Sequence, residues 1–193
     1  MDVSHLLEEL NEAQREAVTT ASQHTLVLAG AGSGKTRVLI HRLAWLIQVE
    51  HVSPLNILAV TFTNKAAGEM RERAQELLSM PTRSMWIGTF HGIAHRLLRM
   101  HWKEAGLPEN FQIIDSDDQH RIIRRLIKEE GLDDAQWPAR QAQWYINARK
   151  DEGQRPDAVE HMDNPITATW VRIYQLYQAY CDRSGLVDFA DLL

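Results

Sequence analysis

A glycine-rich turn between an apolar run and a helical pattern constrains this chain more than any other feature. Residues 29–36 read Ala-Gly-Ala-Gly-Ser-Gly-Lys-Thr, and they follow the apolar run Thr25–Leu28. A helical pattern begins at Arg37. Strand, glycine-rich turn and helix in this order are the context of a phosphate-binding P-loop. The strict pattern starts with glycine, and Ala29 fills that slot as another small residue. We therefore expect an α/β fold whose first strand, Thr25–Leu28, ends at a phosphate site.

Each residue type in this turn has a chemical reason to be there. Gly30, Gly32 and Gly34 allow positive φ angles and a close approach of the backbone to an anion. Amide hydrogens of the turn and of the helix N-terminus then point at phosphate oxygens. Lys35 supplies a point charge for the β- and γ-phosphates, and the Thr36 hydroxyl is a ligand for Mg²⁺. Lys35 and Thr36 are therefore the catalytic candidates, and Thr36 is the metal candidate. The alternative is a glycine-rich turn with an incidental lysine.

Composition excludes several other classes of protein. The chain has 193 residues, a net charge of −5 and a single cysteine, Cys181, so it has no internal disulfide and no cysteine-rich zinc site. His91 and His95 are four residues apart but lack a nearby third ligand. No secretory signal precedes the first helix, and no apolar run approaches the ~20 residues of a membrane span. These features predict a cytoplasmic protein without a membrane partner.

Positive charge is concentrated in one stretch of the acidic chain. Residues 61–103 carry 7 basic and 3 acidic side chains. A local basic surface can follow a polyanion even where the net charge is negative. The alternative is a set of ordinary solvated helix faces.

Strand and helix patterns alternate in the first part of the chain and give way to helices in the second. Asn11 and Gln14 form a capping-box pattern that predicts a helix from Glu12 to about Thr20. Further strands are predicted at 57–61 and 85–88, with helices at 35–49, 65–78 and 91–105. Such alternation favours an open parallel sheet. Helices are predicted at 115–130, 138–150 and 165–183, so we expect an all-helical subdomain inserted into the α/β domain.

Two further motifs follow the later strands. Thr61–Ala67 reads Thr-Phe-Thr-Asn-Lys-Ala-Ala, and Gly88–Gly92 reads Gly-Thr-Phe-His-Gly. Ligands of open parallel sheets bind at the carboxyl ends of the strands, which is where both motifs fall. Each motif combines hydroxyl donors with an aromatic ring that can stack a base. Alone, each is also consistent with a capped helix start and a core aromatic residue, but together they favour a groove for single-stranded nucleic acid.

These motifs carry a family resemblance. Leu10–Ala17 resembles the adenine-reading Q motif of superfamily 1 DNA helicases, and Ala29–Thr36 resembles their Walker A motif. Thr61–Ala67 resembles motif Ia, and Gly88–His91 resembles motif Ib. In order and spacing, the whole chain resembles the N-terminal part of helicases of the UvrD, Rep and PcrA type.

The resemblance implies a fold, an activity and a set of site residues. It implies a RecA-like P-loop NTPase sheet with subdomain 1A at residues 1–114, a DNA-flanking helical subdomain 1B at 115–185, and a return into 1A at 186–193. It implies an ATP- and Mg²⁺-dependent enzyme that moves 3′ to 5′ on single-stranded DNA and unwinds duplex junctions in repair, with DNA-repair proteins as partners. The implied nucleotide-binding residues are Gln14, Ala29, Gly30, Ala31, Gly32, Ser33, Gly34, Lys35, Thr36 and Arg37. The implied DNA-binding residues are Phe62, Thr63, Asn64, Lys65, Thr89, Phe90 and His91.

The sequence also departs from the family pattern. It contains no Asp-Glu Walker B motif and no second motor domain with its arginine finger, so we expect an N-terminal fragment with negligible hydrolysis and an uncovered apolar edge. The late acidic pair, Asp188 and Asp191, is interpreted as a helix cap and a solvated carboxylate. The alternative function is a nucleotide- and DNA-binding module that does not hydrolyse ATP. A P-loop kinase or GTPase is disfavoured, because Asn64-Lys65-Ala66-Ala67 lacks the aspartate of a guanine-reading motif.

Overall fold

The chain divides into two compact units. The computed structural model describes residues 3–21, 24–159 and 164–192. Residues 1–93 form the first unit and residues 94–193 form the second. The division into 1–114, 115–185 and 186–193 stays a prediction.

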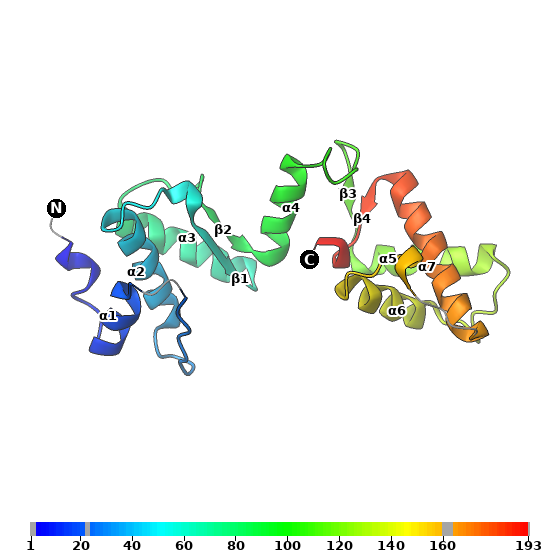
Figure 1. Ribbon diagram of the computed structural model, residues 1–193, viewed down its shortest axis with the longest axis horizontal. Helices are drawn as coiled ribbons and strands as arrows, with labels where there is room; N and C mark the ends of the chain where they lie inside the picture. Colours follow the sequence, from blue (N-terminus) through cyan, green and yellow to red (C-terminus); the bar gives the residue numbers. More distant parts are fainter. Residues whose placement is uncertain (1–2, 22–23, 160–163, 193) are drawn as a thin grey trace. The chain divides into compact units, whose positions relative to one another are not determined.

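The first unit surrounds a pair of parallel strands (Figure 1). Its elements are η1 (Ser4–Leu6), α1 (Glu12–Thr19), α2 (Lys35–Gln48), η2 (Pro54–Asn56), β1 (Leu58–Thr61), α3 (Asn64–Leu78), β2 (Trp86–Thr89) and the start of α4 (Phe90–Met100). β1 and β2 pair in parallel, with Leu58 opposite Trp86 and Thr61 opposite Thr89. Ile40, Met70 and Ile87 are buried between the helices and the strands. The parallel pairing expected from the strand–helix alternation is therefore confirmed for these two strands.

Local caps begin the helices of this unit. The Asn11 side chain accepts a hydrogen bond from the Gln14 backbone N–H, and the Gln14 side chain accepts one from the Asn11 N–H, so the predicted capping box is confirmed. The Thr63 hydroxyl accepts a hydrogen bond from the Ala66 N–H at the start of α3. Such caps satisfy backbone donors that the first helical turn leaves without partners.

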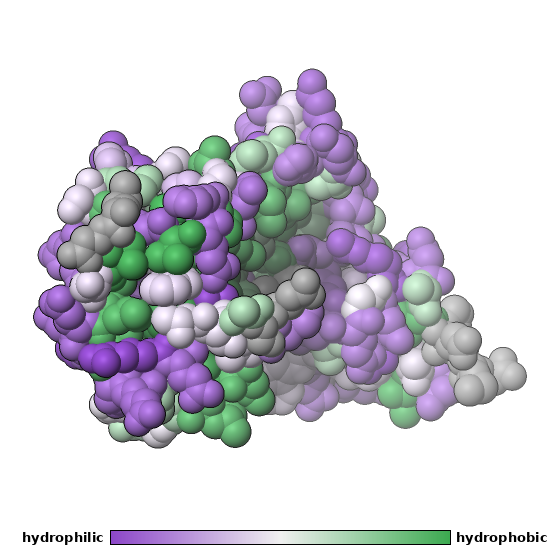
Figure 2. All heavy atoms as spheres, turned by 60° about the vertical axis from the view of Figure 1, so that its left-hand side comes forward, coloured by the Kyte–Doolittle hydropathy of each residue, from purple (hydrophilic) through white to green (hydrophobic). Residues whose placement is uncertain are grey.

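The predicted strand Thr25–Leu28 is wrong for this structure. Residues 24–30 have an irregular conformation, and the Leu26 and Leu28 side chains are 83% and 85% exposed. A strand exists only where another strand supplies hydrogen bonds, and β1 and β2 pair with each other alone among the described residues. In Figure 2, which brings this unit forward, hydrophobic side chains reach the surface between hydrophilic ones. The first unit thus has the uncovered apolar surface that the sequence predicted.

The second unit is mostly helical. It contains the rest of α4, β3 (Gln112–Ile113), α5 (Ser116–Glu129), α6 (Ala139–Asp151), η3 (Pro156–Ala158), α7 (Pro165–Ser184), β4 (Leu186–Val187) and η4 (Ala190–Leu192). The described residues between 115 and 185 form helices and turns without a strand. The parallel pair of β3 and β4 was not predicted, because two-residue strands have no readable alternation.

One apolar core joins the three long helices of this unit. Ile127 of α5, Ile146 of α6 and Tyr177 of α7 are buried together. Asp115 caps α5 by accepting hydrogen bonds from the N–H groups of Asp117 and Asp118. Throughout the described residues, no helix is both long and apolar enough to cross a bilayer.

Candidate nucleotide and nucleic-acid site

The P-loop turns into α2 through two left-handed glycines. Gly32 has φ +76° and Gly34, the N-cap of α2, has φ +86°. The expectation of a positive φ at Gly30 is wrong, because only the later two glycines adopt one. The turn therefore needs glycine at 32 and 34, where an L side chain would be strained.

Lys35 holds the loop from inside. Its Nζ donates hydrogen bonds to the carbonyl oxygens of Ala29 at 3.0 Å and Gly30 at 2.5 Å. The Ser33 hydroxyl donates to the same Gly30 carbonyl at 2.7 Å. The amino group of Lys35 thus lies within the curve of the loop, at the N-terminus of α2, where both the charge and the helix dipole favour an anion.

Gln14 reaches the loop from a distant part of the sequence. Its Nε2 donates to the Ser33 carbonyl at 3.0 Å, while its Oε1 accepts the Asn11 N–H at 3.1 Å. A Cβ built on Gly34 would lie 2.8 Å from Gln14 Nε2, so glycine at this position makes room for the glutamine. The structure therefore brings Gln14 and the P-loop together, as their pairing in one nucleotide site requires.

A pocket of about 610 Å³ opens beside this loop. Its lining residues are Gln14, Gly32, Ser33, Gly34, Lys35, Thr36, Arg37 and Arg73. Three of them are cations, and no carboxylate is among the described residues that line it. This donor set fits a polyphosphate, which needs backbone N–H groups and positive charge. Arg73 was missed as a site residue, since in the sequence it was one of seven basic residues in a long stretch.

The same pocket offers little to a metal ion by itself. Thr36 contributes a hydroxyl, which fits one position in the oxygen shell of Mg²⁺. Without a lining carboxylate among the described residues, the other oxygens would come from phosphate and water. His91 and His95 form no metal site either: the described residues contain no group of three or more metal-ligating side chains.

An aromatic pair marks the carboxyl ends of β1 and β2. Phe62 follows β1 and Phe90 follows β2, and their ring centroids are 5.4 Å apart at an interplanar angle of 45°. Phe62 is 88% exposed and Phe90 is 42% exposed. Exposed aromatic rings are surfaces on which nucleic-acid bases can stack. The alternative of core aromatic residues is wrong at both positions.

The hydroxyls of this edge have structural partners. Thr63 Oγ1 caps α3, and Thr89 Oγ1 accepts a hydrogen bond from the Gly92 N–H at 3.1 Å. Asn64, Lys65 and His91 have exposed side chains on the adjoining helix starts. The structure thus gathers the predicted DNA-binding residues around one strand edge.

A buried charge network in the second unit was not predicted. Lys150 Nζ donates to Asp188 Oδ2 and to Asp191 Oδ2, each at 2.7 Å, and the Tyr177 hydroxyl donates to Asp188 Oδ2 at 2.7 Å. Arg155 Nη1 donates to Asp191 Oδ1 at 2.8 Å. The interpretation of Asp188 as a cap is confirmed, because its Oδ1 accepts a hydrogen bond from the Asp191 N–H at 3.0 Å. The interpretation of the second carboxylate as solvated is wrong, because both carboxylates are largely buried and ion-paired.

This network shifts the ionisation of its members. Burial by itself would raise the pKa of Asp188, but the charge and hydrogen bond of Lys150 and the hydroxyl of Tyr177 bring that pKa below its usual value. Burial also raises the pKa of the Tyr177 hydroxyl, which therefore stays protonated as a donor. The network connects α6, α7 and the segment after β4, and each of its charges has a partner of opposite sign.

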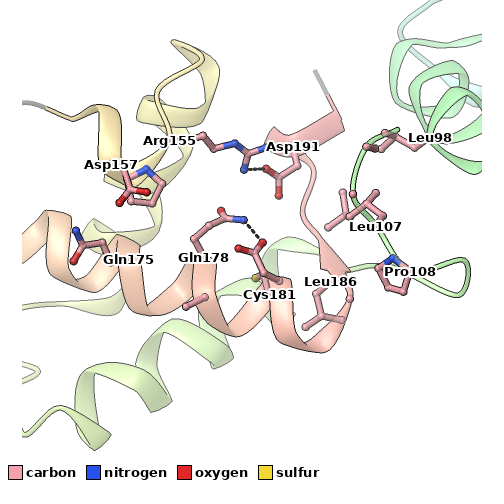
Figure 3. Close-up of a pocket in the computed structure, with 17 residues that line it drawn as sticks. Leu98, Leu107, Pro108, Arg155, Asp157, Gln175, Gln178, Cys181, Leu186 and Asp191 are labelled. Atoms are coloured by element: carbon pink, nitrogen blue, oxygen red, sulfur yellow. Dashed lines mark hydrogen bonds and ion pairs between the residues drawn. The ribbon is translucent and has the colours of Figure 1, made fainter. Parts of the chain in front are cut away.

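A second pocket, of about 560 Å³, lies next to this charge network (Figure 3). Arg155 and Asp191 face each other at its edge, and Gln178 and Cys181 of α7 line its wall. Gln178 Nε2 donates to Asp182 Oδ1 at 2.8 Å. The site residues named by the sequence motifs are absent from its lining.

Comparison with known proteins identifies the family of this chain. Residues 10–193 match the family described as UvrD/REP helicase N-terminal domain. The chain is similar to DNA helicase II of Escherichia coli, with 61% identity over the whole chain and 27% of the relative's length. It is also similar to DNA helicase II of Haemophilus influenzae, at 57% identity over the whole chain and 27% of that protein. ATP-dependent DNA helicase PcrA of Leuconostoc citreum is 46% identical over the whole chain, which covers 26% of its length. The chain thus spans about a quarter of these relatives, and it belongs to the UvrD/REP helicase N-terminal domain family.

Proposed function

We propose that this chain is the nucleotide-binding part of an ATP-dependent DNA helicase that moves 3′ to 5′ along single-stranded DNA and unwinds duplex in DNA repair. The observation that carries the proposal is the placement of α3. This helix begins beside Phe62 at the aromatic edge, and its residue Arg73 lines the P-loop pocket. One rigid element therefore adjoins both proposed ligand sites.

The relatives support the same proposal. Proteins similar to this chain carry the names DNA helicase II and ATP-dependent DNA helicase PcrA. By this likeness we propose a RecA-like arrangement for residues 1–114 and 186–193, with residues 115–185 as a helical subdomain that flanks DNA. The duplex junction and DNA-repair proteins are the partners that this role requires, and the cytoplasm is its compartment.

The P-loop pocket would hold ATP through named groups. The N–H groups at the start of α2 and the Lys35 amino group would bind phosphate oxygens, and the Gln14 amide and Arg37 would adjoin the adenine. Thr36 would give one oxygen ligand to Mg²⁺, which neutralises phosphate charge when bound. Lys35 would exchange its carbonyl partners in the loop for the phosphates.

The aromatic edge would hold single-stranded DNA. Phe62 and Phe90 would stack bases, and each stacked base contributes ~1–3 kcal/mol to binding. Lys65 and His91 would lie along the phosphate backbone. Stacking is tolerant of base sequence, as a protein that moves along DNA requires.

The proposal is tested by two binding measurements on this chain. A fluorescent ATP analogue should bind, and Lys35→Ala should weaken binding by more than about tenfold. Labelled single-stranded DNA should bind in an anisotropy assay, and Phe62→Ala should weaken it. An absence of ATP binding, or equal binding by Lys35→Ala, would contradict the nucleotide site. ATP turnover stimulated by single-stranded DNA would exclude the alternative of a module that never hydrolyses ATP.

A further inference from the structure

We propose that Arg73 of α3 binds the phosphate chain of the nucleotide, as a second cation beside Lys35 in the P-loop pocket. This inference rests on the proposed function and adds to it a residue outside the glycine-rich motif. It names the ligand chemistry as polyphosphate rather than base.

The lining of the pocket supplies the first argument. Lys35 and Arg37 come from the first turn of α2, and Arg73 comes from the third turn of α3. No carboxylate of the described residues lines this pocket, and the loose ion-pair partner of Arg73, Glu69, lies outside its lining. Positive charges that line one cavity repel each other, and an anion bound between them offsets this repulsion. A polyphosphate is the ligand that this arrangement stabilises most.

The lining of a neighbouring pocket supports the placement of the anion in the P-loop pocket. A pocket of about 520 Å³ shares Arg37 and Arg73 with the P-loop pocket, so both residues line both spaces. Glu9 and Glu76 line this second space. Their carboxylates disfavour an anion there, whereas Lys35 and the N-terminus of α2 favour one on the other side. Arg73 therefore borders both an acidic space and the proposed anion site.

The position of Arg73 is set by its helix, and among the described residues its guanidinium group has only a loose ion pair with another side chain. Met70 and Ala74 of α3 are buried in the core, which fixes the orientation of the helix. The Arg73 Nη2 lies 3.8 Å from Glu69 Oε2, a distance typical of a loose ion pair, and the side chain is 56% exposed. Arg71 differs: its Nη2 donates to the Ile87 carbonyl at 3.0 Å, so it ties α3 to β2. Arg73 is thus the arginine of α3 that is available to a ligand.

Arginine and lysine bind phosphate differently, which predicts different effects for two substitutions of Arg73. A guanidinium group can donate two parallel hydrogen bonds to one phosphate, whereas a lysine ammonium acts as a point charge. Arg73→Lys should therefore keep part of the affinity, and Arg73→Ala should lose it.

The experiment is a competition series on the 193-residue chain. Circular dichroism first checks that each variant is folded. Four competitors, ATP, ADP, AMP and adenosine, are then titrated against a bound fluorescent ATP analogue. The proteins compared are the parent chain, Arg73→Ala, Arg73→Lys, Lys35→Ala and the control Arg83→Ala. Arg83 is exposed in the same unit and lies outside the pocket, so its loss removes the same charge without the proposed contact.

We expect Arg73→Ala to weaken ATP binding about tenfold, with smaller losses for ADP and AMP and unchanged binding of adenosine. Arg73→Lys should fall in between, and Arg83→Ala should match the parent chain. Equal affinity of Arg73→Ala and the parent, or an equal loss for adenosine and ATP, would overturn the inference. In that case, weaker ATP binding by Lys35→Ala would still support the proposed nucleotide site. If the parent chain binds no ATP, the proposed function itself fails.

Discussion

Lys150 and Asp188 form an ion pair 2.7 Å long with both side chains only 2% exposed. The two residues are separated by 38 positions in the sequence and connect α6 to the segment after β4. Asp188 also accepts hydrogen bonds from Tyr177 and from the Gln119 side chain, so its carboxylate is saturated with donors. Such a buried pair is costly to break, because removal of one partner leaves the other charge without compensation.

Lys150→Met should therefore destabilise the second unit severely. It leaves the buried carboxylates of Asp188 and Asp191 without their shared cation, and we expect a loss of about 3–5 kcal/mol in the free energy of unfolding. Urea denaturation followed by far-ultraviolet circular dichroism measures it. Arg172→Ala, which breaks the more exposed pair with Glu130, is the control and should cost at most about 1 kcal/mol. Equal losses for the two variants would contradict a special role of the buried pair.

Asp188 also predicts how stability depends on pH. Although burial opposes it, Lys150 and Tyr177 lower the folded-state pKa of Asp188 below the unfolded value of about 3.9. A lowered folded pKa contributes stability that is fully present above the unfolded pKa and is lost as the pH falls through the folded one. The urea midpoint should therefore decline below about pH 4. In Asp188→Asn, which lacks the titrating group, this part of the decline should disappear; an unchanged profile would show that other carboxylates cause it.

Gly34→Ala should damage the P-loop through backbone strain and collision. The residue has φ +86°, and a Cβ would lie 2.8 Å from Gln14 Nε2. We expect a cost of at least about 1–2 kcal/mol and a marked loss of ATP binding, measured by displacement of a fluorescent analogue. Gly68→Ala is the matched control, because Gly68 lies in α3 with open space around its Cβ position. This change should stabilise the chain by about 0.5–1 kcal/mol without weakening ATP binding.

Phe62→Ala should weaken binding of single-stranded DNA without unfolding the protein. The ring is almost fully exposed and contacts Phe90 at its side, so it contributes little to the core. We expect the binding free energy to fall by about 1–3 kcal/mol in fluorescence anisotropy, with an unchanged melting temperature. The same change at Leu55, another exposed apolar residue of this unit, should leave DNA binding as it was. An undiminished affinity of Phe62→Ala would remove the aromatic edge from the DNA site.

The thiol of Cys181 should be unreactive in the folded protein. Its side chain is buried in the core of the second unit, and burial raises the pKa of the thiol to about 11. Thiolate is the reactive form, so an aromatic disulfide reagent at pH 8 should label the chain only after unfolding in urea. Because Cys181 is the one cysteine of the sequence, the signal has a single source. Rapid labelling without denaturant would contradict this burial.

Features encoded in neighbouring residues were predictable from the sequence. The capping box of Asn11 and Gln14 predicted the start of α1, and Asp115 predicted the start of α5, because a cap acts within three residues of its partner. Gly185 predicted the end of α7, which it closes with a left-handed conformation. The P-loop motif likewise predicted the glycine-rich turn into α2.

Features that depend on distant partners were not predictable in the same way. The apolar run at 25–28 has the composition of a strand, but a strand also needs a neighbour, and none of the described strands pairs with it. Arg73 became part of the P-loop pocket only when α3 packed beside α2. The burial and ion pairing of Asp188 and Asp191 were not predictable for the same reason, since their shared cation, Lys150, lies on another helix.

The geometry of α3 has a mechanical consequence. From Thr63 at its cap to Arg73 in the P-loop pocket, the helix advances about 15 Å, at about 1.5 Å for each residue. A hydrogen-bonded helix this short does not stretch, so a shift of Arg73 along the axis by a fraction of an ångström moves Thr63 by the same amount. Phe62 directly precedes that cap, so a rigid shift of α3 along its axis would displace Arg73 at the pocket and the residue next to Phe62 together.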